Sequence, residues 1–574
     1  MPRKFLVTAA LVLLLVACGK QQESSPALEP ADSVFIGSHI LTMDPNMPSA
    51  EAVAVRGEHI VFVGDRSGVK AFTGDKTRVV NLGDHALLPG FIDAHGHFTF
   101  TARTIDFANL SSPPVGKAES VDDIVTLLKA HIAETQPGAG EWVTGYGYDD
   151  SLLEEGRHPT RKDLDQVSTE HPIYLMHVST HLAAVNSAAL AAVGIDANST
   201  NPPGGIIRRW PGTDEPNGVM EETAASTFLF ARMGEIDAQR FTDKIARAIE
   251  LYAGYGITTI QDGASSLSDV EALRAIASKG GVTADVAMFP YANSLQDEDF
   301  ASFNYDGDYL NGVRVAGVKF VIDGSPQGRT AWMTRPYDEL PEGAKQGYVA
   351  YAAADVEDYK KNVAQLVTRG VPVLVHANGD AAIDAMMDGI DDAIIGTAIA
   401  DHRSVIIHAQ LMRQDQLDRA ATLKLVPSFF SAHSFFWGDW HRLSFGEERA
   451  SGISPAASAL AKGVPFTIHN DAPVVPPDMM RLVWATVNRT TRSGYVLGPE
   501  ERLSVTQALH AITLGAAYQY FEEDTKGSLT VGKQADLVIL GADPLEVAPA
   551  TLADVPIVET FSRGKTIFKR KSSH

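Results

Sequence analysis

The sequence has a single cysteine, Cys18, which lies at the end of the first apolar stretch. Disulfide bonds within the chain are therefore excluded, and the folded part of the chain has no thiol for catalysis. The chain also lacks a G-x-S-x-G motif, the turn that exposes the nucleophilic serine of many hydrolases. Hydrolytic chemistry in this protein would need neither of these side-chain nucleophiles if it used activated water.

Basic residues are few compared with acidic ones. The chain has 48 Lys and Arg against 71 Asp and Glu, for a formal net charge of −23. Because phosphate binding needs a basic surface, we expect no nucleic-acid partner and favour a small-molecule substrate. With 574 residues, 45% hydrophobic and 21% charged, the chain is globular and long enough for more than one structural unit.

The first apolar run, from Phe5 to Val16, is too short to span a membrane ahead of a folded domain. It follows Arg3 and Lys4 and therefore has the layout of a secretory signal. The end of the run, LVAC, resembles a bacterial lipoprotein box. This resemblance implies a signal peptide over residues 1–17, a lipid on Cys18 and a tether over residues 18–31. We therefore expect an exported lipoprotein, anchored to a membrane only by its lipid, on the periplasmic or cell-surface side. An ordinary signal peptide is the alternative.

Both ends of the remaining chain are rich in short, alternating strands. The stretches SVFIGSHILTM, AVAVRGEHIVFVG and RVVNLG favour an antiparallel sheet, and GSLTVGKQADLVILG and IVETFSRGKTIFKR continue the pattern near the C-terminus. We predict that residues 32–88 and 527–574 form one discontinuous β-sandwich domain. Residues 89–526 would then be a single domain between them.

That middle region alternates short apolar runs with helical stretches, the α/β pattern of parallel strands with crossover helices. Eight strand candidates are FIDAHGH, ITTIQDG, TADVAMFPY, VAGVKFVIDG, VPVLVHANGD, SVIIHAQL, KLVPSFFSAH and VPFTIHND. Eight such units predict a (β/α)8 TIM-like barrel, with chemistry at the carboxyl ends of its strands. Residues at about 105–250 separate the first two candidates, which is too many for a loop. We therefore predict an insertion with its own helices and at least one strand, PIYLMHV at 172.

Polar residues stand where these apolar runs end. His95 and His97 are two residues apart, so on a strand they face the same way and can hold one cation. Taken singly, each such residue could be a hydrogen-bonded core residue or a cap, but their joint occurrence favours a metal site. The strand-end residues are His95, His97, Lys319, His376, His408 and Asp471.

Lys319 lies within the apolar run VAGVKFVIDG, where a free ammonium would carry a large desolvation cost. Carbamylation by CO₂ would convert its amine into a carboxylate that can bridge two cations. The alternative is a lysine paired with Asp323 or Asp471.

The motifs together resemble the amidohydrolase superfamily, and more closely its YtcJ-like branch, which includes N-substituted formamide deformylase. The resemblance covers residues 32–570 and rests on LPGFIDAHGHF, VSTHLAAVNSAAL, GITTIQDG, VKFVIDGSPQGRTA, LVHANGD, IIHAQL, HNDAP and GSLTVGKQADLVIL. It implies a metal-dependent hydrolase with two divalent ions, with zinc as our first choice and a single ion left open. In this pattern His95, His97 and Asp471 hold the more buried metal, His376 and His408 the second, and carbamylated Lys319 bridges them.

One departure concerns Asn470, which stands where family members commonly have serine before the final aspartate. The preceding residue, His469, shares the face of Asp471 by strand alternation. It could be a ligand or a hydrogen-bond partner, but we expect it to be packed in the barrel.

The ligand set predicts attack of a metal-activated water on a carbonyl carbon, with Asp471 as the catalytic base. We favour cleavage of the C–N bond of an N-acyl or N-formyl amine with an apolar amine side. Cyclic amides or esters at the same centre, or a non-catalytic ligand-binding lipoprotein, remain alternatives, and oligomerisation is left open. The residues expected to contact substrate are His181, Asn186, Arg329, Phe430 and Trp437.

The lipoprotein hypothesis predicts that Cys18→Ser releases a soluble and active protein, because the barrel does not depend on the lipid. Lipid anchoring depends on the buried chains, so losing them should remove the protein from membranes. Sedimentation with membranes and activity of the supernatant test this. A Cys18→Ser protein that still sediments with membranes would contradict the hypothesis.

Overall fold

The computed structural model of the chain describes residues 29–571 apart from residues 181, 204, 234–237, 342–343 and 400. The predicted signal peptide and Cys18 lie outside the described residues. The predicted tether extends too far, because Ala31 is buried and its N–H donates to the carbonyl of Phe72. Within the described ranges, no helix combines the length and apolar character needed to cross a membrane.

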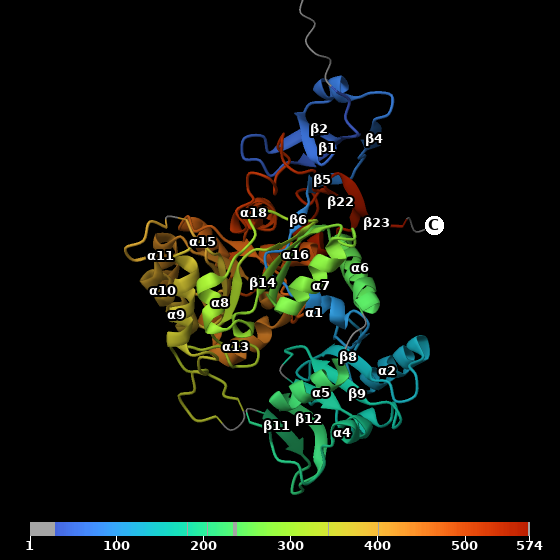
Figure 1. Cartoon of the computed structure of the whole chain (residues 1–574), viewed down its shortest axis with the longest axis vertical. Helices are drawn as coiled ribbons and strands as arrows, with labels where there is room; N and C mark the ends of the chain where they lie inside the picture. The colour runs from blue at the N-terminus through green and yellow to red at the C-terminus, as the bar shows by residue number, and fades with distance from the viewer. Residues whose placement is uncertain are drawn as a thin grey trace, which may run out of the picture.

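The two chain ends form one mixed sheet, drawn in blue and red in Figure 1. Its strand order is β23-β22-β21-β5-β1-β2-β3, with β4 beside β1. The strands are β1 (Ser33–Leu41), β2 (Ser49–Arg56), β3 (His59–Gly64), β4 (Arg78–Asn81), β5 (Ala86–Pro89), β21 (Leu537–Leu540), β22 (Ile557–Ser562) and β23 (Lys565–Lys569), with short 3-10 helices at Gly68–Phe72 and Pro549–Asp554. The ends join where β5 pairs antiparallel with β21. The expectation of a purely antiparallel sheet is wrong, because β1 runs parallel to both β4 and β5.

This sheet curls over on itself. Phe35 of β1 meets Phe561 of β22 edge to face, with ring centroids 5.3 Å apart. In a flat sheet the three ladder steps between these strands would separate the residues by about 14 Å. The register shift of β1 between Ile36 and Ile40 marks the bend, because irregular pairing increases local twist. One face of the sheet thereby encloses an apolar core that includes Phe35, Val53 and Phe561.

The middle of the chain forms two parallel sheets with helices outside them (Figure 1). One has the order β15-β14-β13-β6 and the other β16-β17-β18-β19-β20. Their strands are β6 (Phe91–Ile92), β13 (Ile257–Ser265), β14 (Asp285–Pro290), β15 (Val313–Val315), β16 (Val318–Val321), β17 (Val373–Ala377), β18 (Val405–His408), β19 (Val426–Phe429) and β20 (Thr467–Ile468). Strands β15 and β16 together take the place of the single fourth strand that the sequence predicts.

The strands of the predicted (β/α)8 TIM-like barrel form two sheets, so the strand ladder is open at two seams. At one seam a bridge between Tyr291 and Lys319 connects the sheets. At the other, the N–H of Asp471 donates to the carbonyl of His95 and the N–H of His97 donates to that of Ala472. The second seam joins the ends of the first and last strands, which fixes three predicted site residues against one another.

Helices follow the strands and cover the outside of these sheets. They are α1 (Phe98–Thr104), α6 (Ala238–Gly254), α7 (Leu267–Ala277), α8 (Asp297–Ser302), α9 (Val356–Val367), α10 (Asp380–Ile394), α11 (Gln414–Leu423), α12 (His433–Phe436), α13 (Gly438–Phe445), α14 (Glu447–Ser451), α15 (Ala456–Ala461), α16 (Met479–Asn488), α17 (Val505–Ala511) and α18 (Leu514–Gln519), with 3-10 turns at Ala292–Ser294 and Pro499–Glu501. Helix α9 begins after Asp355, which caps it by accepting the N–H groups of Glu357 and Asp358. Its apolar face, including Val363 and Leu366, is buried.

The insertion is a separate layer of strands and helices at the end of the molecule opposite the composite sheet (Figure 1). Its sheet has the order β11-β12-β10-β9-β8-β7 and spans residues 108–222, within the predicted 105–250. Its elements are β7 (Ala108–Asn109), β8 (Val143–Tyr148), β9 (Ile173–His177), β10 (Leu182–Val185), β11 (Gly205–Arg209), β12 (Pro216–Glu222), α2 (Val121–Thr135), α3 (Arg161–Leu164), α4 (Ser187–Val193) and α5 (Thr223–Met233). The Tyr146 hydroxyl donates to the carbonyl of Pro473, so the insertion contacts the loop that follows β20.

Candidate metal centre

All six strand-end residues of the sequence prediction gather at one end of the parallel sheets. Five of them line a cavity of about 670 Å³, and His95 lies buried beneath it. The five are His97, Lys319, His376, His408 and Asp471. Residues Ser179 and Thr180 of the insertion line the same cavity, so the insertion forms part of its wall.

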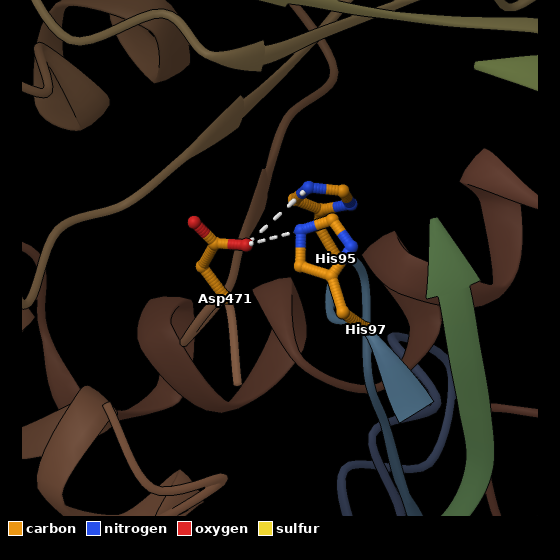
Figure 2. Close-up of side chains that lie close together, drawn as sticks. All are labelled: His95, His97 and Asp471. Carbon is orange, nitrogen blue, oxygen red and sulfur yellow. Dashed lines mark ion pairs between the residues drawn. The ribbon is translucent and has the colours of Figure 1, made fainter. Parts of the chain in front are cut away.

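His95, His97 and Asp471 form one group of close side chains (Figure 2). Nε2 of His97 lies 3.1 Å from Oδ1 of Asp471, and Nε2 of His95 lies 3.5 Å from the same oxygen. This oxygen is buried and, among the described residues, has no hydrogen-bond partner. A buried carboxylate oxygen facing two imidazole nitrogens is therefore suited to a cation.

His376 and His408 form a second pair, in which Nδ1 of His376 lies 3.1 Å from Nε2 of His408. Nε2 of His376 is 3.0 Å from the carbonyl oxygen of Gly324. Nδ2 of Asn378 lies at the same distance, 3.0 Å, from this nitrogen, so Nε2 of His376 has both a possible acceptor and a possible donor beside it. The facing nitrogens of His376 and His408 are about as close as two ligands of one ion.

Burial lowers the pKa values of three of these side chains. Desolvation, followed by the nearby cationic Lys319, lowers the pKa of His95 well below its usual value. Desolvation and then His376 do the same to the pKa of His408. Burial also lowers the pKa of Lys319 to about 7, against the opposing effect of Asp471. Neutral imidazoles are the form that binds metals, and a neutral amine is nucleophilic.

Two residues that hold the ligands were not identified from the sequence. Oε1 of Gln261, on β13, lies 2.5 Å from Nδ1 of His95 and so orients its Nε2 toward Lys319 and Asp471. Asp323 accepts backbone N–H groups and lies 3.4 Å from Nε2 of His376. The alternative of a Lys319–Asp323 pair is therefore not supported. A glutamine within a strand gives no sequence signal, whereas Asp323, which follows the Lys319 strand, was considered from the sequence only as a partner of Lys319.

His469 is packed in the barrel, as expected, and it also has hydrogen-bond partners there. It is fully buried, but its Nε2 lies 3.1 Å from Nδ1 of His408 and its Nδ1 lies 2.8 Å from the hydroxyl of Ser428. Partners of this kind fix the tautomer and ring orientation of a metal-ligating histidine. The hydrogen-bond alternative for His469 is thus the one that the structure supports.

The backbone at the site adopts conformations that non-glycine residues rarely take. His408, Ala409 and Asp471 have φ values of 73°, 46° and 58°. Such left-handed residues cost energy and cluster at functional sites. Gly263 is required for packing, since a Cβ there would lie 2.6 Å from Cε1 of His95.

Only some of the residues predicted to contact substrate line the cavity. Phe430 lines the cavity. Trp437 is buried and packs on Phe430, with ring centroids 6.1 Å apart, but is not among the residues that line the cavity. Arg329 is engaged elsewhere, since it pairs with Glu339 at 2.8 Å and lies over the ring of Trp440. These contacts tie down its loop. His181 lies outside the described residues.

The structure contradicts the prediction that Asn186 contacts substrate. Asn186 is fully buried and caps α4, where its side-chain oxygen accepts the N–H groups of Ile173 and Ala189. Its amide donates to the carbonyls of Ser168 and His171. All four hydrogen-bonding positions of the side chain are used within the insertion, so none is left for a ligand.

Comparison with known proteins identifies the family to which the chain belongs. The model described as "Amidohydrolase family" matches residues 78–568, and the chain belongs to this family of hydrolases. It is 27% identical over 559 residues to N-substituted formamide deformylase of Arthrobacter pascens, covering 94% of this chain and 99% of the relative. It is 26% identical over 552 residues to the putative amidohydrolase YtcJ of Bacillus subtilis, covering 94% and 99%. Protein LONG AFTER FAR-RED 3 of Arabidopsis thaliana is 27% identical over 559 residues, covering 95% and 92%.

Solved structures share the fold. A metal-dependent hydrolase of Pyrococcus horikoshii OT3 matches with a TM-score of 0.71 and 23% identity, covering 90% of this chain and 99% of that one. The atrazine chlorohydrolase TrzN of Arthrobacter aurescens TC1, in complex with zinc, matches with a TM-score of 0.51 and 14% identity, covering 94% and 95%.

The contacts of Asn186 predict that Asn186→Ala destabilises the insertion without weakening substrate binding. Loss of the cap and of buried hydrogen bonds should cost about 2–4 kcal/mol. The urea midpoint and KM, measured at equal metal content, test this. Asn198→Ala, an exposed asparagine in the same insertion, is the control and should change neither. A raised KM with an unchanged urea midpoint would restore the substrate role.

Proposed function

We propose that this protein is a metal-dependent hydrolase that cleaves the C–N bond of a small N-acyl or N-formyl amine. The observation that carries the proposal is that four imidazoles, one lysine and one carboxylate lie together at one end of the parallel sheets. The residues are His95, His97, His376, His408, Lys319 and Asp471. We also propose that the protein is exported and anchored through Cys18.

The donor atoms fit divalent ions. Ligands of a tetrahedral Zn²⁺ at about 2.0–2.1 Å lie about 3.3 Å from one another. The Nε2 atoms of His95 and His97 lie 3.5 and 3.1 Å from Oδ1 of Asp471, and the facing nitrogens of His376 and His408 are 3.1 Å apart. Imidazole nitrogens favour zinc, and carboxylate oxygens are compatible with it. We therefore propose two ions, one held by each group.

Lys319 lies beside the first group, with Nζ 3.0 Å from Nε2 of His95. Because its pKa is lowered to about 7, the neutral amine is abundant at mildly alkaline pH. Attack of this amine on CO₂ gives a carbamate and releases one proton. The resulting carboxylate would supply the oxygen ligands that the second group lacks, so we propose carbamylated Lys319 as the bridging ligand.

When bound, divalent ions polarise a carbonyl group and lower the pKa of water. Asp471 is placed to do the proton chemistry, because it lines the cavity beside the other ligand residues. In the proposed reaction the water oxygen bonds to the carbonyl carbon while its proton passes to Asp471. The proton then moves to the departing nitrogen as the C–N bond breaks, which yields an acid and an amine.

The walls of the cavity suggest an apolar group on the substrate. Phe430, Phe100 and Val474 line it together with the ligands. The similarity to an N-substituted formamide deformylase supports an amide with a substituted nitrogen. The same ions would serve the hydrolysis of N-acyl amines, esters and cyclic amides, so the metal centre does not distinguish these substrates. Activity measured on a panel of all three separates the proposed class from the alternatives.

The proposal predicts that Asp471→Asn retains most of its metal but loses at least about a hundredfold in turnover. The amide is nearly isosteric and its oxygen can approach an ion, but it cannot accept the proton of water. Turnover must be compared per measured metal ion. His97→Ala is the contrasting variant, because loss of a ligand should lower metal content and turnover together. If Asp471→Asn keeps most of its activity with both ions bound, Asp471 is not the proton acceptor.

A further inference from the structure

Two buried histidines outside the ligand set form a pair next to the cavity. His433 begins α12 and His441 lies in α13, both after β19, and their exposed fractions are 3% and 0%. Nδ1 of His433 lies 2.9 Å from Nε2 of His441. The ring planes differ by 5°, so the two rings lie nearly parallel and share this hydrogen bond.

The surroundings of His441 decide where the protons lie. Burial lowers the pKa of His441 to about 3 and that of His433 well below its usual value, so both rings are neutral and each has one N–H. Nδ1 of His441 is buried and, in the described part of the chain, has no hydrogen-bond partner. A buried N–H without an acceptor is the rarer and costlier case, so Nδ1 carries the lone pair. Nε2 of His441 then donates to Nδ1 of His433, which leaves the proton of His433 on Nε2.

This Nε2–H is directed to the cavity. His433 lines the same cavity as the ligand residues. Within the described ranges, no residue accepts a hydrogen bond from Nε2 of His433, and this nitrogen is not fully buried. Phe430 and Trp437 hold the ring in place, each with its centroid 4.5 Å from that of His433. Phe430 also packs on His469, at 5.3 Å, so one aromatic ring separates His433 from the ligand cluster.

We propose that His433 binds substrate by donating a hydrogen bond from Nε2 to an uncharged carbonyl oxygen outside the cleaved bond, and that His441 is a positioning residue that fixes the tautomer. The oxygen of the cleaved bond belongs at the ligand cluster, and the ring of Phe430 keeps His433 apart from it. A neutral donor among aromatic rings does not compensate a carboxylate, which selects an uncharged acceptor. The proposal rests on the proposed function for the class of substrate.

Equilibrium binding tests this proposal on the metal-loaded full-length Asp471→Asn protein, so that turnover does not intervene. The probes are N-acetylphenylalanine amide and N-acetylphenethylamine, which differ only in a second carboxamide. We expect the first to bind about tenfold more tightly, as one added hydrogen bond implies. His433→Phe should abolish this difference, whereas His433→Asn, which retains an N–H donor, should keep part of it.

His441→Phe should reduce the difference between the probes, but it should have no further effect once His433 is Phe. A purely structural role for His441 would instead weaken binding of both probes equally and lower the urea midpoint, which is measured in parallel. Equal affinity for the two probes in the parent protein, or a difference that survives His433→Phe, would overturn the proposal. Hydrolysis of N-acetylphenethylamine by the unsubstituted protein is recorded separately, because its absence counts against the proposed function and not against the role of His433.

Discussion

Desolvation at the ends of the parallel strands is the constraint on which this site depends. His95, His408 and Lys319 are buried, so the neutral forms of these groups are favoured. The same burial raises the pKa values of Asp93 and Asp323 to about 7. A cluster of buried imidazoles and carboxyl groups is costly in the absence of cations. Bound divalent ions would offset that cost, which links metal binding to the stability of the strand ends.

The fold positions these groups at the two seams where the parallel sheets meet. Backbone hydrogen bonds join the segment containing His95 and His97 to the segment containing Asp471, although these are far apart in sequence. The bridge between Tyr291 and Lys319 fixes the lysine at the other seam. The composite sheet lies at one end of the parallel strands and the insertion at the other, where it helps to enclose the cavity. The open ladder therefore coincides with the places where the ligands are held.

The sequence predicted those parts of the site that follow from strand periodicity. A histidine or aspartate at the end of an apolar run must lie at the strand end, so His376, His408 and Asp471 could be placed without a structure. The supporting contacts of Gln261 and His469 could not be predicted, because they depend on which strands become neighbours. Asn186 was misjudged for a related reason: its motif lies near the site, but its side chain is used as a helix cap. The parallel pairing of β1 was also missed, since alternation does not encode strand direction.

Crystallographic density around Lys319, with anomalous data collected at the zinc edge, tests the central claim most directly. The account predicts two anomalous peaks in the purified protein. One should lie among His95, His97 and Asp471, and the other beside His376 and His408. Density for a carbamate on Nζ of Lys319 should connect them. An unmodified Lys319 with one fully occupied ion would contradict the two-ion centre, and no ion in protein that is active would contradict the metal-dependent account as a whole.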